Sequence, residues 1–451
     1  MLSPFPFKET AMSTSHFQYI CVMFPYPSGE GLHVGHCYNY MIIDSLARWK
    51  RHQGMDVFQP FGYDAFGLPA ENYARKIGGN PRTVTEHNIV QFRQQMERMN
   101  TAFEERLVTS DASYVKWTQE IFNILHRRGL AYKAWKDVHW CSSCQTVLAN
   151  EQAASGSCER CETRVETKNL NQWFFKITDY KERLIKNLDG INYPESTIKQ
   201  QRVWLNQLND WCVSRQRSWG CPIPIEGETD TLDTFVDSSF YYLRYCTQST
   251  TELIPKDDYK QVDIYVGGAE HACMHLIYAR FIHMVLFDEG LVPQEEPFKQ
   301  VVHQGMITKD GAKMSKSKGN VVNPDDYNAD ELRLYLMFMG PYTEGGDWSD
   351  SHIKGIRRFI ARIEKWLSQA SSDGVDVNSA LNDLEERIGE HVDRWKFNKV
   401  VSSLMEFYNA HKQTIMTSEN AIRFMKIIQN FAPGFSPQIL LEKHLKQRSK
   451  S

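Results

Sequence analysis

The chain has 451 residues, of which 41% are hydrophobic and 24% are charged, and its formal net charge is −3. This composition excludes a disordered tail, a collagen-like chain, a disulfide-stabilised mini-protein and a uniformly basic nucleic-acid-binding protein. The length predicts about three domains. The sequence has no secretory signal and no apolar segment long enough to span a membrane, so we expect no membrane partner. With ten cysteines and no such signal, a reduced, cytoplasmic protein is favoured.

The first predicted unit is a strand, a helix and a second strand. Residues Phe17 to Phe24 form an apolar, aromatic and β-branched run typical of a buried strand, and a Pro/Gly-rich turn follows it. Apolar residues then recur at helical spacing from His36 to a stop at Gly54, and Asp56 to Pro60 is a second strand candidate. This order predicts the start of a parallel sheet.

The same pattern returns near residue 263. We predict a strand at Asp263 to Val266, a turn at Gly267 and Gly268, a helix from Glu270 to Glu289 and a strand from Phe298 to Met306. Two such halves predict an α/β fold with a Rossmann-like doubly wound parallel sheet, whose ligand binds at the switch point between the halves. We place the halves at residues 16–135 and 171–330.

Between the halves lie two C-x-x-C pairs, Cys141 with Cys144 and Cys158 with Cys161. Four thiolates at this spacing are typical of a closed, structural Zn²⁺ site, and a redox disulfide pair suits a doubled knuckle less well. The sequence therefore predicts a zinc-ribbon insertion at residues 136–170.

The last part of the chain is predicted to be helical. Strand signals vanish after about Glu331, and helical periodicity covers Lys354 to Leu367, Leu381 to His411 and Ala421 to Phe431. These segments predict a helical bundle at residues 331–451.

Two polar motifs lie on the two halves of the predicted sheet. His33-Val34-Gly35-His36 lies at a helix N-terminus, where unpaired N–H groups favour phosphate, although alone such a motif is more often an ordinary helix start. The run from Lys313 to Asn320 places three lysines among Ser and Gly. Such a run is typical either of a cationic loop that closes on phosphates or of an ordinary solvated surface loop.

Together the two motifs, in this order, resemble the HIGH-type and KMSKS signatures of class I aminoacyl-tRNA synthetases. The stretches MFPYPSGEGLHVGH, GYDAFGLPAENYA, DWCVSRQRSWGCPIPI and HQGMITKDGAKMSKSKGN are similar to leucyl-tRNA synthetases in particular. The resemblance implies a monomeric ligase that activates leucine with ATP and Mg²⁺ to leucyl-adenylate and transfers it to tRNA(Leu).

The resemblance also implies that the bundle at residues 331–451 is a truncated, anticodon-binding-like domain, and it implies roles for individual residues. The catalytic residues would be His33 and His36 on the ATP phosphates and Lys313 and Lys316 on the pyrophosphate leaving group. The other ATP-binding residues would be Gly35, Gly267, Gly268, Glu270, Ser315 and Ser317. The amino acid would be bound by Phe24, Tyr26, Asp64, Phe235, Ser238, Tyr241 and His275, with Asp64 on its ammonium group.

The chain departs from the leucyl pattern in what it lacks. Only Leu205 to Asn209 joins two segments that usually flank a large editing domain, and the C-terminal tRNA-binding extension is also expected to be missing. These departures leave three functions open: a leucine–tRNA ligase without editing, an enzyme that transfers leucine to a carrier-protein thiol or a small amine, and a non-catalytic leucine or nucleotide sensor. The intact histidine and lysine motifs argue against the sensor.

Overall fold

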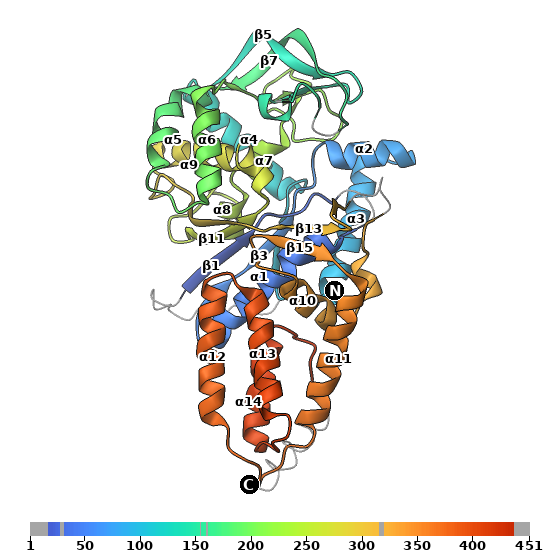
Figure 1. Ribbon diagram of the computed structural model, residues 1–451. Helices are drawn as coiled ribbons and strands as arrows, with labels where there is room; N and C mark the ends of the chain where they lie inside the picture. The colour runs from blue at the N-terminus through green and yellow to red at the C-terminus, as the bar shows by residue number, and fades with distance from the viewer. Residues whose placement is uncertain (1–16, 28–30, 154, 159–160, 315–319, 437–451) are drawn as a thin grey trace.

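The computed structural model describes residues 17–27, 31–153, 155–158, 161–314 and 320–436. Three parts follow one another along its length: an antiparallel ribbon at one end, an α/β core in the middle and a helical bundle at the other end (Figure 1). None of the helices in the described residues is both long enough and apolar enough to span a membrane.

The core is built on a parallel sheet, as predicted. Its four strands lie in the order β12 (Phe298–His303), β11 (Val262–Gly267), β1 (Phe17–Val22) and β2 (Asp56–Phe58). A second parallel pair continues the first half, β3 (Pro60–Tyr63) with β4 (Glu104–Val108). Strand β1 is the first strand of the first half and pairs with β11 of the second half, so the switch point lies between these two strands.

Strand β1 explains why the sheet is covered on both faces. Ile20 and Val22 pack in the cluster formed with helix α1 (Val34–His52), whereas Tyr19 and Cys21 pack in the cluster on the opposite face. The helices of that second cluster include α4 (Ala112–Arg127) and α9 (His275–Asp288). Successive side chains of a strand point to opposite faces, so an unbroken apolar run fits a strand buried on both sides.

The second half differs from the prediction at two points. The helix predicted from Glu270 begins only at His275, because Met274 has φ −119° and ψ −102° and a short 3₁₀ turn (Ala269–His271) precedes it. The strand predicted to reach Met306 ends at His303. A Cβ at Gly305 would collide with the backbone of Glu344 and Gly345, so the chain turns away there in close contact with a later segment.

That later segment is a strand that the sequence analysis missed. It forms a small sheet in the order β14 (Ala312–Lys313), β13 (Met306–Lys309) and β15 (Gly345–Trp348). The prediction of no strand beyond Glu331 was therefore wrong. Its sequence, GGDW, has no β-branched residue, and the strand exists because β13 offers it a pairing edge.

The insertion contains a long antiparallel ribbon. Its sheet has the order β6 (Thr146–Leu148), β5 (Ala131–Cys141), β7 (Glu166–Phe175) and β8 (Trp211–Cys212). The other elements between β3 and β11 are α2 (Leu68–Ile77), α3 (Pro81–Arg98), α5 (Lys181–Asn187), α6 (Glu195–Asn206), β9 (Ser214–Arg215), β10 (Thr231–Leu232), α7 (Thr234–Ser238) and α8 (Tyr241–Tyr245). Helix α6 ends at Asn206 and β8 begins at Trp211, so only a short turn joins them.

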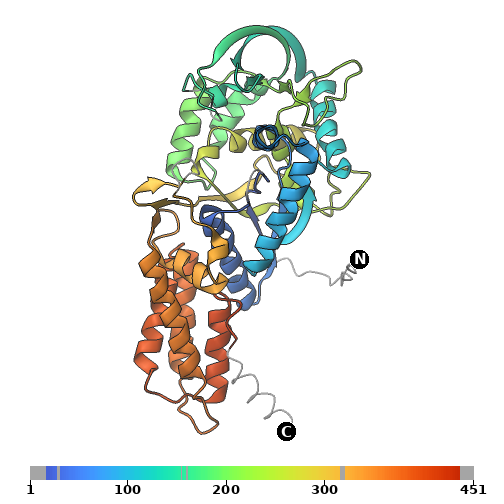
Figure 2. The ribbon, with the colours of Figure 1, turned by 90° about the vertical axis from the view of Figure 1, so that its right-hand side faces the viewer.

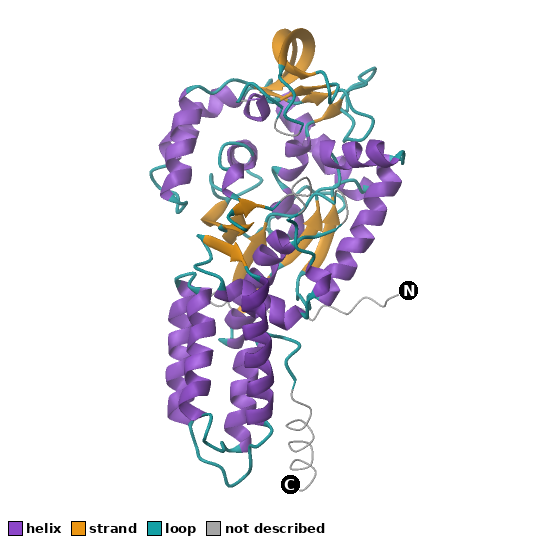
Figure 3. Cartoon of the chain, turned by 45° about the vertical axis from the view of Figure 1, so that its right-hand side comes forward, coloured by secondary structure: helices purple, strands orange, loops and turns teal. Residues whose placement is uncertain are grey.

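The bundle follows helix α10 (Ala329–Phe338), which packs on α1. Its helices are α11 (Asp350–Leu367), α12 (Asn378–Asp393), α13 (Phe397–His411) and α14 (Ser418–Gln429) (Figures 2 and 3). The single helix predicted from Leu381 to His411 is divided, because Trp395 adopts the left-handed φ of 59°. The bundle shares one hydrophobic cluster with α1, and the ring of Trp49 lies 5.7 Å from that of Phe431.

Candidate active site

A cleft with about 1150 Å³ of empty space, its open mouth included, lies at the carboxyl ends of β1 and β11. The two strands are in register, with Val22 opposite Val266, and the Met23 N–H donates to the Val266 carbonyl at 2.8 Å. The cleft is therefore lined from both halves of the chain. The predicted site residues that line it are Phe24, Tyr26, Gly35, His36, Phe235, Gly267, Gly268 and Glu270.

Two histidines form the N-terminal cap of α1, and His36 lines the cleft whereas His33 is not among its lining residues. The Gly35 N–H donates to His33 Nδ1 at 3.0 Å, the His33 N–H donates to His36 Nδ1 at 3.2 Å, and the two rings lie 4.0 Å apart. Because each Nδ1 accepts, each neutral ring carries its proton on Nε2. Burial, with repulsion from His33, lowers the pKa of His36 to about 3, so His36 is a neutral N–H donor at a helix N-terminus.

The opposite wall of the cleft is held by a histidine that the sequence analysis missed. Nδ1 of His303 lies 2.8 Å from the Gly267 carbonyl, and Nε2 lies 2.8 Å from Thr197 Oγ1 on α6. A carbonyl only accepts, so Nδ1 carries the proton, and burial lowers the pKa of His303. A Cβ at Gly267 would collide with the Met23 side chain, so any larger residue would displace Met23 where the two strand ends meet.

A narrower pocket continues from the cleft. All seven side chains predicted to surround an amino acid line it, with about 280 Å³ of empty space including the mouth. Phe24 stacks on Tyr241 at 3.9 Å, which gives the pocket a flat apolar wall. The pocket is also lined by three residues that the analysis did not predict: Met23, Tyr265 and His271.

One side of the pocket is polar but uncharged. Tyr241 Oη lies 2.8 Å from Tyr265 Oη, which lies 2.5 Å from His275 Nε2, and Ser238 Oγ lies 3.3 Å from His275 Nδ1. Burial, with repulsion from His271, lowers the pKa of His275 to about 3. An apolar side chain of a ligand in this pocket would therefore contact aromatic rings and neutral hydrogen-bonding groups.

Asp64 supplies a carboxylate to the same pocket and is only 1% exposed. Its N–H donates to the Pro25 carbonyl at 3.0 Å, and its Oδ1 accepts from Thr234 Oγ1 at 3.1 Å and Thr109 Oγ1 at 3.4 Å. These contacts from three separate segments fix a negatively chargeable group beside the apolar wall. Such a group suits the ammonium of an amino acid.

The predicted lysine loop can be placed only in part. Lys313 is the last residue of β14. The predicted residues Ser315, Lys316 and Ser317 lie outside the described residues.

The four predicted metal ligands come together at the end of the ribbon. The sulfur atoms of Cys141, Cys144, Cys158 and Cys161 all lie within 4.8 Å of one another. Zn–S bonds of about 2.3 Å in a tetrahedron place the sulfurs roughly 3.8 Å apart, so the donor set fits Zn²⁺. Four thiolates would complete the coordination and leave no open position for a substrate.

Comparisons with known proteins agree with this geometry. The family described as tRNA synthetases class I (M) matches residues 18–358. The leucine–tRNA ligases of Clostridium perfringens and Clostridium botulinum are each 31% identical to this chain, over 93% of this chain and 85% of the relative. The alignment with the first spans 696 positions, more than the 451 residues of this chain, so the relative carries long segments without a counterpart here.

Solved structures share the fold. The crystal structure of a ternary complex of Agrobacterium radiobacter K84 agnB2 LeuRS, tRNA and LeuAMS superposes with a TM-score of 0.88 at 24% identity, covering 96% of this chain and 86% of that chain. Methionyl-tRNA synthetase of Mycobacterium tuberculosis bound by methionyl-adenylate gives a TM-score of 0.74 at 21% identity, covering 94% of this chain and 93% of that chain.

Proposed function

The chain belongs to the class I aminoacyl-tRNA synthetases, is an aminoacyl-tRNA ligase of the leucyl-tRNA synthetase type, and on that premise we propose that it activates leucine and charges tRNA(Leu) without editing. The observation that carries this proposal is the junction of two spaces at the switch point. The cleft beside His36 and Gly267 opens into the apolar pocket that contains Asp64, and Phe24 lines both spaces.

The nucleotide half of the reaction would use the cleft. Leucine's carboxylate attacks the α-phosphorus of ATP, and because this nucleophile is already ionised, the protein's task is positioning and charge stabilisation. We assign His33 and His36 to the phosphates, Lys313 and Lys316 to the pyrophosphate, and Gly35, Ser315 and Ser317 to the same phosphate end. Gly267, Gly268 and Glu270 would hold the adenosine, with the carboxylate on the ribose hydroxyls.

The metals have separate roles in this proposal. Mg²⁺ would accompany the ATP phosphates and neutralise part of their charge. Zn²⁺ on Cys141, Cys144, Cys158 and Cys161 would stabilise the end of the β5–β7 ribbon and take no part in the chemistry.

The amino-acid half would use the pocket. Asp64 would pair with the ammonium group, while Phe24, Tyr26, Phe235 and Tyr241 would surround the isobutyl side chain, with Ser238 and His275 beside them. A pocket without a buried charge opposite the side chain favours an apolar amino acid, because a polar side chain would lose its hydrogen bonds to water there.

Absence of editing is proposed from the turn between Asn206 and Trp211. The side chain of Asp210 in this turn accepts hydrogen bonds from Tyr132 at 2.6 Å and Thr178 at 2.6 Å. The turn is short and anchored, and long segments of the relatives have no counterpart in this chain. An apolar pocket alone distinguishes one methylene by only about 1–3 kcal/mol, so such an enzyme would release some misactivated product.

Transfer to tRNA is favoured over transfer to a carrier protein. The solved LeuRS that resembles this chain in length and fold was crystallised with tRNA and LeuAMS.

The test has two stages. First, purified protein is assayed for ATP–pyrophosphate exchange with leucine, isoleucine, norvaline and methionine, and leucine is expected to give the highest kcat/KM. Second, radiolabelled leucine is supplied with a tRNA(Leu) transcript and, in parallel, with a tRNA of another identity as the control. Exchange without charged tRNA(Leu) would refute the acceptor, and the absence of exchange with any amino acid would refute the whole proposal.

The editing proposal is tested separately with norvaline. Norvalyl-tRNA(Leu) is expected to accumulate, and ATP consumption should stay close to one per charged tRNA. A protein that edits would instead consume ATP in excess while charged norvalyl-tRNA stays low, which would contradict the proposal.

A further inference from the structure

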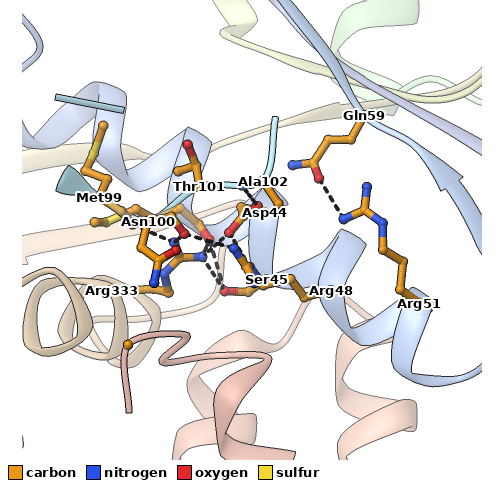
Figure 4. Close-up of polar contacts among 12 residues, drawn as sticks. Asp44, Ser45, Arg48, Arg51, Gln59, Met99, Asn100, Thr101, Ala102 and Arg333 are labelled. Atoms are coloured by element: carbon orange, nitrogen blue, oxygen red, sulfur yellow. Dashed lines mark hydrogen bonds and ion pairs between the residues drawn. The ribbon is translucent and has the colours of Figure 1, made fainter. Parts of the chain in front are cut away.

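The end of helix α3 is locked between two helices that carry or follow the signature motifs. Arg333 of α10 and Asp44 of α1 are fully buried and form an ion pair at 2.6 Å (Figure 4). Arg333 also donates to the carbonyls of Met99 at 2.9 Å and Asn100 at 3.1 Å, while Asp44 Oδ1 accepts from the Ala102 N–H at 2.8 Å. The C-terminal end of α3 therefore has one position relative to α1 and α10.

One turn before this anchor, Gln95 of α3 bridges the residue that precedes His33 and the turn that follows the lysine run. Its Oε1 accepts from the Leu32 N–H at 2.7 Å, and its Nε2 donates to the Leu32 carbonyl at 3.5 Å and to Asp325 Oδ2 at 3.3 Å. Leu32 immediately precedes His33. Asp325 lies in the 3₁₀ turn (Pro324–Asp326) between the lysine segment and α10. Gln95 is only 2% exposed, so these contacts are shielded from water.

The chemistry of the contacts gives the amide only one orientation. The Leu32 N–H can only donate, so the oxygen of Gln95 must face it and the NH₂ group must face Asp325. Gly31 allows the close approach: its φ is +95°, and a Cβ there would lie 2.6 Å from Gln95 Oε1. A second contact joins the same two segments, since the Val34 N–H donates to the Val322 carbonyl at 3.4 Å.

We infer that Gln95 is a positioning residue for adenylate formation. It sets the distance between the helix start that carries His33 and His36 and the segment that returns from the lysines. The inference rests on the proposed function, in which both motifs act on the same triphosphate. Because a misplacement of about 1 Å can cost on the order of a hundredfold in rate, a buried bridge between the two motifs controls kcat more than it controls substrate affinity.

The chain supplies a matched control on the same helix face. Arg98, three residues after Gln95, donates to the same Asp325 Oδ2 at 3.1 Å, but its side chain is 58% exposed and its hydrogen bond goes to Asp325, not to Leu32. Arg98→Ala therefore removes a contact with Asp325 and leaves the Leu32 bridge. Gln95→Glu keeps an acceptor for Leu32 and turns a second oxygen toward the Asp325 carboxylate.

The experiment measures leucine-dependent ATP–pyrophosphate exchange. Gln95→Ala and Gln95→Glu are expected to lower kcat by about ten- to a hundredfold while the KM for leucine stays within about twofold. Arg98→Ala should stay within about twofold of wild type in both parameters. Asp325→Asn combined with Gln95→Glu should recover most of the lost kcat, because the Asn NH₂ can donate to the new carboxylate.

Three results would overturn the inference. The first is equal kcat in Gln95→Glu and in the double variant; the second is a rise in the KM for leucine that accounts for the whole loss. The third is a loss of activity that tracks thermal stability, tested against Arg333→Met, which weakens the anchor of α3 but leaves Gln95 in place. If wild-type protein shows no exchange with any amino acid, the proposed function itself has failed, and the inference falls with it.

Discussion

Replacement of Arg333 by methionine is expected to destabilise the protein strongly, because it breaks the ion pair that joins α1 to α10. The guanidinium donates to Asp44, to Ser45 Oγ at 3.3 Å and to the carbonyls of Met41 at 3.0 Å, Met99 and Asn100. Methionine matches the volume of the side chain but donates nothing. The buried carboxylate keeps Arg48 at 2.7 Å as its cation, and the carbonyls lose a donor.

The magnitude follows from what is left unpaired. Removal of one member of a buried pair typically costs about 3–5 kcal/mol, whereas an exposed pair contributes about 0–1 kcal/mol. Arg357 of α11 offers the matched control: it pairs at 2.9 Å with Glu331 of α10, the helix that also carries Arg333, but the Arg357 side chain is 60% exposed. We therefore expect Arg333→Met to lower the free energy of unfolding by about 3–5 kcal/mol and Arg357→Met by less than about 1 kcal/mol.

The dependence on pH gives a second signature. Burial acts to raise the pKa of Asp44, but Arg333 and then Arg48 oppose it, and the pKa lies below its ordinary value. The pair therefore contributes its full stability above the unfolded pKa of about 3.9, and the contribution is lost as pH falls through the lower folded pKa. In Arg333→Met the buried carboxylate keeps only Arg48, so the pKa of Asp44 should rise and the variant's deficit should be smaller at pH 4.5 than at pH 7.5.

The assay is equilibrium urea unfolding of wild type, Arg333→Met and Arg357→Met at both pH values. A deficit for Arg333→Met below about 1 kcal/mol, equal to that of Arg357→Met, would refute the assignment of a buried ion pair. A deficit that is large but identical at the two pH values would refute the role of Asp44, and would attribute the loss to the unpaired carbonyls instead.

Three further predictions concern the metal and the active site. Cys158→Ser should lose the zinc that atomic emission detects after dialysis against a mild chelator, while Cys246→Ser, outside the cluster, retains it; equal zinc in both would contradict a four-thiolate site. His36→Asn should lower kcat/KM for ATP by about 10²–10³-fold. Because the pKa of His36 is about 3, the plot of wild-type kcat/KM against pH should show no ionisation between pH 6 and 8 that the variant lacks. Asp64→Asn should raise the KM for leucine about ten- to a hundredfold and leave the KM for ATP nearly unchanged, in the same exchange assay; parallel changes in both would argue against an ammonium contact.

The sheet could be predicted because its strands carry their own signal. Strand β1 is apolar on both faces, and its alternate residues fill the two clusters that cover the sheet. The pocket residues could also be predicted, because Phe24, Asp64 and His275 belong to stretches that resemble one known family. The resemblance implied that these three residues surround one pocket, and the structure places all three in its lining, while their roles stay predictions.

The features that were missed depend on contacts between distant segments. Strand β15 exists because β13 pairs with it, since three of its four residues are Gly or Asp, which are depleted in strands. Trp395 takes a left-handed conformation that a bulky residue rarely adopts, and its ring stacks on Tyr342 at 5.6 Å. In the sequence, Tyr265 is one residue of a predicted apolar strand. Its hydrogen bond to His275 could not be predicted because it depends on how α9 packs on the sheet.

The shared hydrophobic cluster of α1 and the bundle has a consequence for how the molecule moves and comes apart. Helix α1 packs under the sheet with Ile20 and Val22 and also packs in the same cluster as the bundle, so no aqueous layer or flexible linker separates the two parts. A bundle joined in this way is not a detachable module: a fragment cut after α10 would expose a broad apolar surface and aggregate. Within the described residues this cluster holds the bundle against α1, so under the proposed function a tRNA on the bundle would approach the cleft at an angle set when the chain folds.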